Sequence, residues 1–360
     1  MNADEPRLKG RTMKTIVFGN SKVSQEGPCY VIAEIGHNHQ GNLETAVKMI
    51  QVAASCGVQA VKFQKRDNRA LYTKALYNKP YDNENSYGDT YGAHREFLEF
   101  GRDEYLELKK CAQDHHVEFM ATAFDFKSAD FLEELGVTSY KLASGDITNT
   151  ELIKYVARFR KPMFMSTGAA SLADVRIGYE AASAVNDQIC LLHCTAGYPT
   201  EYPFLNLRAV TTLKKEFPDA VIGYSGHDNG ILAAVIAYLL GATVVEKHFT
   251  LNHSWKGTDH RFSLEPEGLR KQVRDLQRVD VALGSGEKIL MDFERDAKAK
   301  MGKGIYSARK LKAGTVIGRE DICLKSPANG IPAYLFESLI GKKLQKDVEE
   351  ETPISPDMTA

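Results

Sequence analysis

Short runs of apolar residues alternate with longer amphipathic stretches from about residue 29 onward. The runs have the length and composition of buried strands, and most of the stretches between them repeat apolar residues at helical spacing. This alternation is typical of strand–helix units around a parallel sheet. Eight runs fit the description: 29–36, 60–64, 119–124, 139–144, 162–167, 189–194, 220–226 and 244–250.

The number of runs decides between two parallel-sheet architectures. Helix candidates such as 43–57 and 232–242 lie between the runs and end at a glycine or another small residue. Eight strands, each followed by a helix, predict a closed (β/α)8 TIM barrel, because a doubly wound open sheet usually has about five to seven strands. We therefore expect an α/β barrel with the carboxyl ends of its strands on one face.

One connection is much longer than the others. Residues 65–102, after the second run, are polar, rich in aromatic residues and only weakly periodic. A long loop in a compact domain is usually functional, and the connections after barrel strands lie on the face where active sites are built. We expect this segment to form an irregular loop on that face.

The last part of the chain has a different pattern. A helix predicted near 265–283 is followed by a charged connector, and the remainder has short strands and turns without a long helical period. This change indicates a second, small domain rich in β-structure. We predict a barrel domain over residues 1–283, a linker over 284–303 and a small domain over 304–360.

Composition excludes several classes of protein. The 360 residues include 46 Lys and Arg and 47 Asp and Glu, so the formal net charge of −1 provides no overall attraction to nucleic acid or to an anionic membrane. The six cysteines are scattered without a CxxC pair, and no apolar window is long enough to span a membrane. We expect a soluble, cytoplasmic protein with reduced thiols.

Charged side chains recur near the carboxyl ends of the predicted strands, where alternate residues share a face. Lys62 and Gln64 share a face in the second run, Glu34 lies near the end of the first, and Lys141 lies in the fourth. Two ammonium groups facing one cavity suit a phosphate or a carboxylate. Ion pairs of these lysines with Glu34 and Asp146 are the structural alternative. Hydroxyl groups, each of which alone is typical of a turn, add to this set: Thr122, Ser144, Ser166, Thr195 and Ser225.

Two histidines form the sharpest candidate site. His227 and His248 come from the ends of the seventh and eighth runs, which are neighbours in a barrel. Neutral imidazole is a common ligand of divalent metals, and a site with two protein ligands keeps open positions for Lewis-acid catalysis. The pair alone does not distinguish Zn, Mn, Fe and Co, and buried structural histidines are the alternative. After the first run, we expect His37 or His39 to hydrogen-bond substrate or backbone.

Longer motifs allow comparison with a known family. They are AEIGHNHQGN (33–42), VKFQ (61–64), YKLASGD (140–146), HCTAGYPT (193–200), GYSGH (223–227), EKHFTL (246–251) and KGTDHRFSLEP (256–266). Together, and in this order, they resemble the sialic acid synthases, which condense phosphoenolpyruvate with an N-acylmannosamine. The tail, with IYSARKLKAGTVIGREDI (305–322) and LIGKKLQKDVEEETPI (339–354), resembles the antifreeze-like (SAF) domain of that family. The resemblance covers almost the whole chain after residue 28.

The resemblance implies a set of roles for the candidate residues. It implies a divalent metal, usually Mn²⁺ with Mg²⁺ or Co²⁺ as alternatives, on His227 and His248. It also implies a homodimer in which the small domain of one subunit covers the active site of the other. The catalytic residues that it implies are Glu34, Lys62, Lys141, Asp146 and Asp259. The substrate-binding residues that it implies are Gln64, Thr122, Ser144, Ser166, Tyr198 and Ser225.

The reaction implied by the resemblance is a condensation that cleaves a C–O bond and releases phosphate. Its product is a nonulosonic (sialic) acid, or the 9-phosphate when the sugar is N-acetylmannosamine 6-phosphate. Residues 74–100 look more like the animal-type branch, which uses the phosphorylated sugar. In that case we expect Lys74 and Lys79, together with Arg69, to hold the sugar phosphate, and a solvated charged loop is the alternative.

The sequence departs from the family at two positions. Ala196 stands where many bacterial members have an asparagine that contacts phosphoenolpyruvate. Ser326 stands where many have an arginine that reaches the N-acyl group across the dimer. Two other functions are compatible with the residues: a metal-dependent pyruvate aldolase, and a non-catalytic carbohydrate- or ice-binding protein suggested by the tail.

Overall fold

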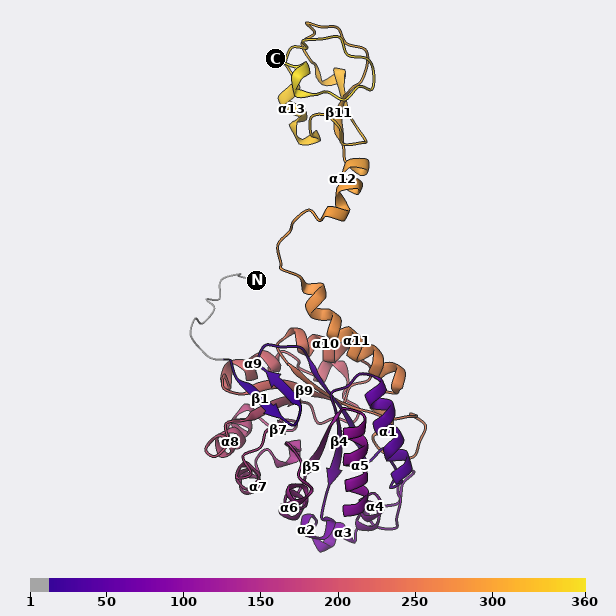
Figure 1. Cartoon of the computed structure of the whole chain (residues 1–360), viewed down its shortest axis with the longest axis vertical. Helices are drawn as coiled ribbons and strands as arrows, with labels where there is room; N and C mark the ends of the chain where they lie inside the picture. The colour runs from indigo at the N-terminus through magenta and orange to yellow at the C-terminus, as the bar shows by residue number, and fades with distance from the viewer. Residues whose placement is uncertain (1–12) are drawn as a thin grey trace. The chain divides into compact units, whose positions relative to one another are not determined.

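The structure is a computed structural model that describes residues 13–360. It divides into two units, one that ends at Leu283 and one that spans Gly284–Ala360 (Figure 1). No helix among the described residues is both long enough and apolar enough to cross a membrane.

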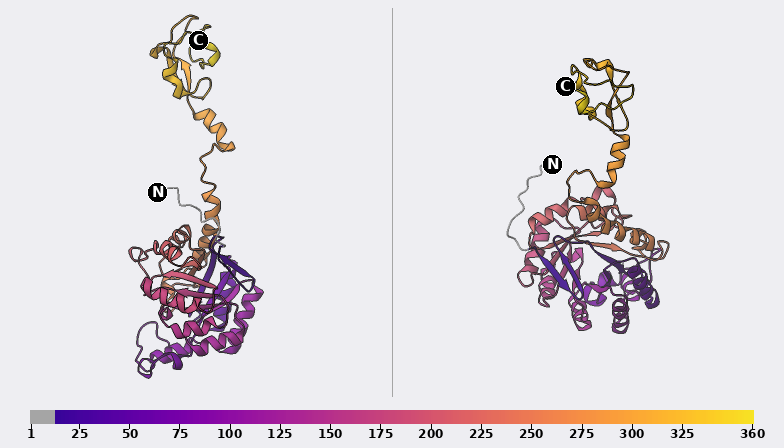
Figure 2. Two further views of the ribbon diagram at one scale, coloured as in Figure 1. Left: turned by 90° about the vertical axis from the view of Figure 1, so that its left-hand side faces the viewer. Right: turned by 45° about the horizontal axis from the view of Figure 1, so that its top comes forward.

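The first unit is a closed barrel of eight parallel strands (Figures 1 and 2). Strand β10 pairs with β3 and closes the barrel, so the predicted (β/α)8 architecture and all eight predicted strands are confirmed. The strands are β3 (Tyr30–Gly36), β4 (Ala60–Lys65), β5 (Glu118–Ala123), β6 (Tyr140–Leu142), β7 (Met163–Ser166), β8 (Ile189–Cys194), β9 (Val221–Gly226) and β10 (Val244–His248).

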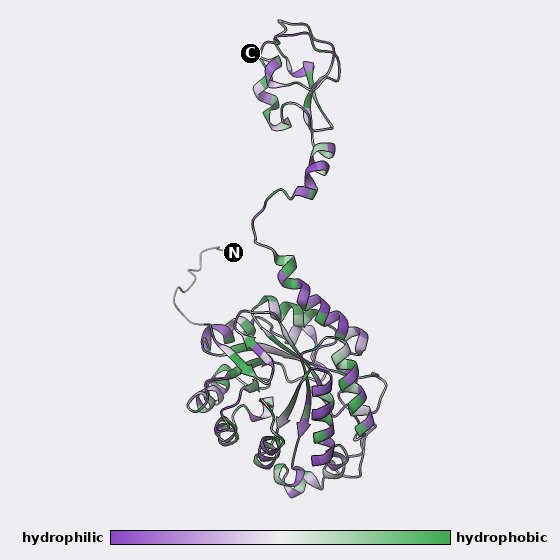
Figure 3. Ribbon diagram, viewed as in Figure 1, coloured by the Kyte–Doolittle hydropathy of each residue, from purple (hydrophilic) through white to green (hydrophobic). Residues whose placement is uncertain are grey.

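A main helix follows each strand and covers the outside of the barrel (Figure 2). Each of these helices contains both polar and apolar residues, as is typical of amphipathic helices that lie between solvent and core (Figure 3). They are α1 (Leu43–Ser55), α5 (Arg102–Asp114), α6 (Phe126–Leu135), α7 (Thr150–Ala157), α8 (Leu172–Ser183), α9 (Ala209–Glu216), α10 (Leu232–Leu239) and α11 (Pro266–Leu283).

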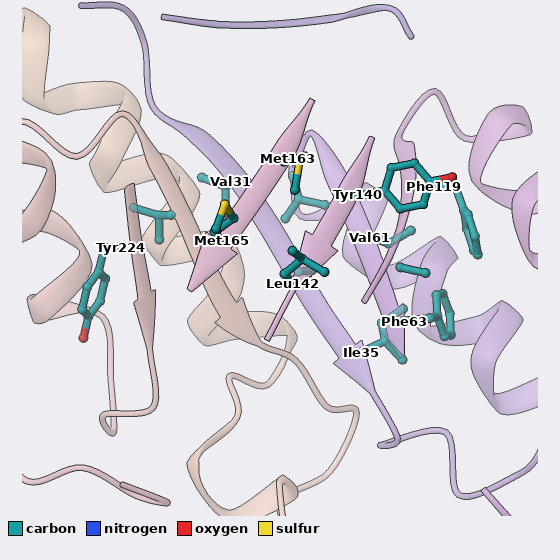
Figure 4. Close-up of a cluster of buried hydrophobic side chains, with 14 of the residues drawn as sticks. Val31, Ile35, Val61, Phe63, Phe119, Tyr140, Leu142, Met163, Met165 and Tyr224 are labelled. Carbon is teal, nitrogen blue, oxygen red and sulfur yellow. The ribbon is translucent and has the colours of Figure 1, made fainter. Parts of the chain in front are cut away.

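The alternation of each strand separates two sets of buried residues. Outward-facing side chains such as Val61, Phe63 and Met165 pack in the core between the strands and the helices (Figure 4). Inward-facing side chains fill the amino-terminal half of the barrel with an apolar cluster, and polar inward-facing residues follow toward the carboxyl ends. The apolar cluster contains Ile32, Ala60, Met120, Phe164, Cys190, Leu192, Val221 and Val244.

A two-stranded hairpin precedes the barrel, and the sequence pattern does not predict it. Strands β1 (Thr15–Phe18) and β2 (Ser21–Ser24) pair antiparallel, and Ile16, Phe18 and Val23 belong to the apolar cluster inside the barrel. The hairpin therefore closes the amino-terminal end of the barrel interior. Four-residue strands are too short for periodicity to reveal them.

The long connection after β4 is more regular than its pattern suggests. It contains three short helices, α2 (Asn68–Leu71), α3 (Lys74–Tyr77) and α4 (Tyr91–Phe97), so the expectation of an irregular loop is wrong over these residues. Each helix is capped by a side chain that accepts a hydrogen bond from the backbone N–H three residues later. The capping residues are Asp67, Thr73 and Thr90.

The second unit is small and has its own core. Strands β11 (Gly304–Ser307) and β12 (Ile322–Lys325) pair antiparallel, and the short helices α12 (Arg295–Met301) and α13 (Phe336–Leu339) lie in the same unit. Most of its remaining pairing consists of isolated bridges, which agrees with the predicted turn-rich domain. Its core is formed by Ile305, Leu311, Ile317, Ile322, Ile331, Leu339, Leu344, Val348 and Ile354.

The hairpin offers a test of its role in closing the barrel. Phe18 is 3% exposed and packs edge-on against Tyr30 and Phe164, whereas Val17 on the same strand is 60% exposed. We predict that Phe18→Ala lowers the free energy of unfolding of the barrel unit by about 3–5 kcal/mol, because it leaves a cavity. Urea unfolding followed by fluorescence of Trp255, the only tryptophan, measures this unit. Val17→Ala is the control, and equal effects of both substitutions would contradict a plugging role.

Candidate functional site

A cavity of about 670 Å³ lies among the carboxyl-terminal ends of the barrel strands. Its volume is within the range usual for small-molecule sites. The connections after β4, β6, β8 and β10 contribute to its wall. Thirteen of the predicted site residues line it: Glu34, Lys62, Gln64, Thr122, Lys141, Ser144, Asp146, Ser166, Tyr198, Ser225, His227, His248 and Asp259.

Strand register explains why residues distant in sequence meet here. Glu34 is paired with Lys62 across β3 and β4, and with His248 across β3 and β10. Gln64 is paired with Thr122, which is itself paired with Lys141. Because these residues occupy inward-facing positions at similar heights in a closed barrel, their side chains form one continuous polar layer.

A buried ammonium group lies at the centre of this layer. Lys62 Nζ is 2.6 Å from Glu34 Oε2 and 3.4 Å from Glu246 Oε1, and it donates to Thr122 Oγ1 at 3.0 Å. Burial alone would lower the pKa of Lys62, but the two carboxylates outweigh burial and raise it. The ion-pair alternative therefore describes Lys62, which is charged and already partnered. Sequence reasoning gave Glu246 no role.

The two carboxylates differ in their surroundings. Burial and the negative charge of Glu246 raise the pKa of Glu34, although Lys62 opposes them. Burial would also raise the pKa of Glu246, but Lys62 and Lys141 outweigh it and lower this pKa. Gln64 Nε2 donates to Glu34 Oε1 at 2.7 Å, which fixes the orientation of that carboxyl group.

Lys141 is a buried cation without a carboxylate partner. Its Nζ donates to Ser166 Oγ at 2.7 Å and to the Leu142 carbonyl oxygen at 2.8 Å. Within residues 13–360, no carboxylate oxygen lies within 4 Å of this ammonium, so the expected alternative pairing with Asp146 is not formed. Burial lowers the pKa of Lys141 from its ordinary value. An anion in the cavity would give this ammonium a direct ion-pair partner.

The two predicted metal ligands lie together. The ring centroids of His227 and His248 are 5.4 Å apart, and both side chains line the cavity. His227 Nδ1 lies 3.0 Å from the Thr195 carbonyl oxygen; a carbonyl only accepts, so Nδ1 carries the proton and Nε2 keeps its lone pair. Burial and His248 lower the pKa of His227 to about 4, which keeps the ring neutral.

The donor set fits a divalent cation bound by two imidazoles. Nδ1 of His248 is buried and has no hydrogen-bond partner, and Asp259 Oδ2 lies 3.7 Å away. Among the described residues, no group of three or more His, Cys, Asp and Glu side chains has the spacing of a complete metal site. A cation on His227 and His248 would therefore take its remaining ligands from water or substrate.

A second cationic region lies beyond the strand ends and was missed by the sequence reasoning. Arg66 donates to Gln64 Oε1 at 2.6 Å, and its guanidinium stacks on Phe124 at 3.7 Å. Arg95, on α4, contacts the hydroxyl of Tyr91 through Nε and NH2 at 3.1 and 3.0 Å. Strand parity continued by one step past Gln64 would have indicated Arg66, whereas no periodic signal indicated Arg95.

Several residues singled out in the sequence do not line the cavity. Lys74 and Lys79 are exposed on and just after α3, and neither lines the cavity. Ala196 is also exposed and does not line it. In the second unit, Ser326 donates to the Gly302 carbonyl oxygen at 2.9 Å.

A buried ion pair holds the backbone next to the two histidines. Lys247 Nζ lies 2.7 Å from Asp228 Oδ1, and both side chains are 1% exposed. Tyr224 donates to the same carboxylate oxygen at 2.8 Å. Because Asp228 follows His227 and Lys247 precedes His248, the pair ties the two histidine-bearing segments together on the outer side of the barrel.

Known proteins are similar to this chain over nearly its whole length. Residues 49–288 match the NeuB family, and residues 302–359 match the SAF domain. The chain is 38% identical to human N-acetylneuraminate-9-phosphate synthase, with 93% of this chain and 94% of that protein covered. It is 35% identical to N,N'-diacetyllegionaminic acid synthase of Legionella pneumophila, with 91% and 93% covered. The solved N-acetylneuraminic acid synthetase of Leptospira borgpetersenii superposes with a TM-score of 0.68 at 32% identity, over 79% of this chain and 95% of that chain.

The buried ion pair gives a prediction about stability. Asp228→Asn leaves the Lys247 ammonium without its countercharge, and we predict a loss of about 3–5 kcal/mol in the free energy of unfolding. The control is Asp187→Asn, which breaks the exposed pair of Asp187 with Lys14 and costs less than about 1 kcal/mol. Urea unfolding followed by Trp255 fluorescence measures both. Equal losses in the two variants would show that the buried pair does not hold the barrel together.

Proposed function

The chain belongs to the NeuB family, and we propose that it condenses phosphoenolpyruvate with N-acetylmannosamine, its 6-phosphate or a related hexosamine or hexose. The product is a nonulosonic (sialic) acid or its 9-phosphate. The observation that carries the proposal is a single cavity that combines the unpaired Lys141 ammonium with two neutral histidines. An anionic substrate and a carbonyl substrate can be held side by side in such a cavity.

Phosphoenolpyruvate is assigned to the deep end of the cavity. Lys141 and Ser166 form a ready-made donor pair for a phosphate or carboxylate oxygen, and Thr122 and Ser144 add hydroxyl groups nearby. Lys62 contributes positive charge while Glu34 and Glu246 hold it in place. This assignment follows the roles that the family resemblance implies for the same residues.

The reaction forms one C–C bond and breaks one C–O bond. The enol carbon C3 of phosphoenolpyruvate attacks the C1 aldehyde of the open-chain sugar, whose oxygen takes a proton and becomes a hydroxyl group. Water adds at C2, and the bond between C2 and the bridging phosphate oxygen then breaks, which releases phosphate. Glu34 is the residue that we assign to orienting the water or moving a proton, because Gln64 orients its carboxyl group within the cavity.

The remaining predicted residues position the sugar. Asp259 accepts from Thr258 Oγ1 at 2.8 Å and lies beside His248, and Tyr198 places its ring 4.2 Å from that of His227. Both therefore lie where the reacting aldehyde has to be held. His227 and His248 would hold a divalent ion, for which we propose Mn²⁺; when bound, such an ion supplies Lewis acidity to a carbonyl oxygen.

We propose a cytoplasmic homodimer in which the second unit of one subunit covers the cavity of the other, as the resemblance implies. Apolar side chains exposed at the end of α11 and in the connecting segment support a partner surface there, since Val281 and Phe293 are each 84% exposed. The alternative of a non-catalytic carbohydrate- or ice-binding protein is not supported, because relatives that match nearly the full chain are named synthases.

A substrate panel scored by phosphate release tests the proposed reaction. We predict that the purified protein with Mn²⁺ and phosphoenolpyruvate releases phosphate only when N-acetylmannosamine, its 6-phosphate or a related hexosamine or hexose is added, and that the product carries three additional carbons. Pyruvate in place of phosphoenolpyruvate gives no product, whereas turnover of pyruvate would favour the aldolase alternative. Absence of phosphate release across the panel would refute the proposal.

The metal assignment has a test that does not depend on turnover. Isothermal titration of Mn²⁺ into protein without substrates measures affinity directly, and we predict that His248→Ala weakens it by about tenfold or more. His115→Ala removes an exposed histidine at the end of α5 and serves as the control. An unchanged Mn²⁺ affinity in His248→Ala would contradict the ligand assignment.

A further inference from the structure

The outer part of the cavity holds two arginine side chains, Arg66 and Arg95, that form few direct ion pairs. Arg66 and Arg95 line the cavity, and Lys65 lies next to Arg66 in the chain; the carboxylate close to Lys65 and Arg66 is that of Glu99. Glu99 Oε2 lies 3.2 Å from Lys65 Nζ, whereas Glu99 Oε1 lies 3.9 Å from Arg66 NH1. In the part of the chain that the structure describes, the Arg95 guanidinium has no carboxylate oxygen within 4 Å. Arg66 thus shares one carboxylate with Lys65, and Arg95 has no carboxylate in direct contact among the described residues.

The two guanidinium groups also compete for a single acceptor. Arg66 NH1 lies 3.1 Å from His37 Nε2, and Arg95 NH1 lies 3.3 Å from His37 Nδ1. Burial and the two arginines hold the pKa of His37 well below its ordinary value, so the ring is neutral. A neutral imidazole accepts at only one nitrogen. At any moment one arginine N–H that faces this ring therefore lacks an acceptor.

Both guanidinium groups are held in position without a ligand. Arg66 is 7% exposed, stacks on Phe124 and is tied to Gln64, while Arg95 is fixed on the hydroxyl of Tyr91. Planar guanidinium groups bind phosphate oxygens in pairs, and fixing them beforehand reduces the entropy lost on binding. Two such groups with unused donors on one cavity wall form a pocket for an anion with several oxygens.

We infer that Arg66 and Arg95 form a second anion subsite, which binds a phosphoryl group on the far end of the sugar. Lys141, the cation assigned to phosphoenolpyruvate, lies within β6, whereas Arg66 follows β4 and Arg95 lies on α4, beyond the strand ends. The sugar aldehyde C1 has to meet phosphoenolpyruvate at the deep end, so the opposite end of the hexose chain, C6, points outward. The inference rests on the proposed function and selects the 6-phosphorylated sugar as substrate.

This subsite differs from the one expected from the sequence. Lys74 and Lys79 do not line the cavity, and the Arg69 guanidinium stacks on Tyr77 outside the cavity wall. Arg66, which does line it, is connected to the catalytic layer by contacts that run from Lys62 through Glu34 and Gln64, and Arg95 lies next to Arg66 across the His37 ring. A phosphoryl group bound by Arg66 and Arg95 would therefore be held in a fixed position relative to the reacting groups.

Steady-state kinetics with N-acetylmannosamine and its 6-phosphate test the inference. We expect the unmodified enzyme to prefer the 6-phosphate by about 100-fold in kcat/KM, because charge-assisted hydrogen bonds to phosphate are strong. Arg95→Gln lowers kcat/KM for the 6-phosphate by about 10–100-fold, changes that for the free sugar by less than about threefold, and leaves the KM for phosphoenolpyruvate unchanged. Arg95→Lys, which keeps the charge, recovers part of the loss.

Arg102→Gln is the matched control, since this exposed arginine pairs with Glu134 and lies outside the cavity wall. Three results would overturn the inference: an equal loss for both sugars in Arg95→Gln, equal use of both sugars by the unmodified enzyme, or a selective loss in Lys74→Ala/Lys79→Ala with none in Arg95→Gln.

An equilibrium measurement separates this inference from the proposed reaction. Isothermal titration of N-acetylmannosamine 6-phosphate without phosphoenolpyruvate gives tighter binding than the free sugar, and Arg95→Gln removes the difference. If the protein binds the 6-phosphate selectively but never releases phosphate from phosphoenolpyruvate, the subsite stands and the proposed reaction fails. If the unmodified protein shows no preference for the 6-phosphate in binding, the subsite is wrong.

Discussion

The buried ammonium of Lys62 between Glu34 and Glu246 is the interaction on which the site depends. Charges inside a barrel are costly unless they are paired and hydrogen-bonded, and here each carboxylate is held by the same cation. The apolar cluster below, closed by the β1–β2 hairpin, supports this polar layer. Inside the barrel, residues near the amino-terminal ends of the strands therefore form an apolar core, and residues near the carboxyl-terminal ends form the polar site, as is usual in closed barrels of this type.

Much of this layer could be predicted from the sequence because alternation in a strand is a strict rule. Lys62, Gln64 and His248 follow directly from parity at the ends of recognised strands. Residues of the long connection could not be predicted in the same way, because α4 is short and Arg95 is placed by tertiary packing. Lys74 was chosen for its charge alone, and charge without geometry does not identify a cavity wall. The hairpin was missed because its strands are four residues long.

The cavity has two cationic ends with different construction. At the deep end, Lys141 is a compact ammonium group among hydroxyl groups, and at the outer end Arg66 and Arg95 are planar groups fixed by stacking and by a tyrosine. Two small anionic groups can therefore bind in one cavity without exchanging places. On the proposed function, this division explains how a chain with a net charge of −1 could bind two phosphorylated substrates, since cationic side chains are concentrated in the cavity.

The most direct test of this account is a crystal structure of the protein with phosphoenolpyruvate as the only added ligand. The account predicts that its phosphoryl and carboxylate oxygens contact Lys141, Ser166 and neighbouring hydroxyl groups at the deep end, while Arg66 and Arg95 remain free of it. Phosphoenolpyruvate bound between Arg66 and Arg95, with no ligand oxygen near Lys141, would contradict the assignment of the two ends and with it the proposed order of the substrates in the cavity.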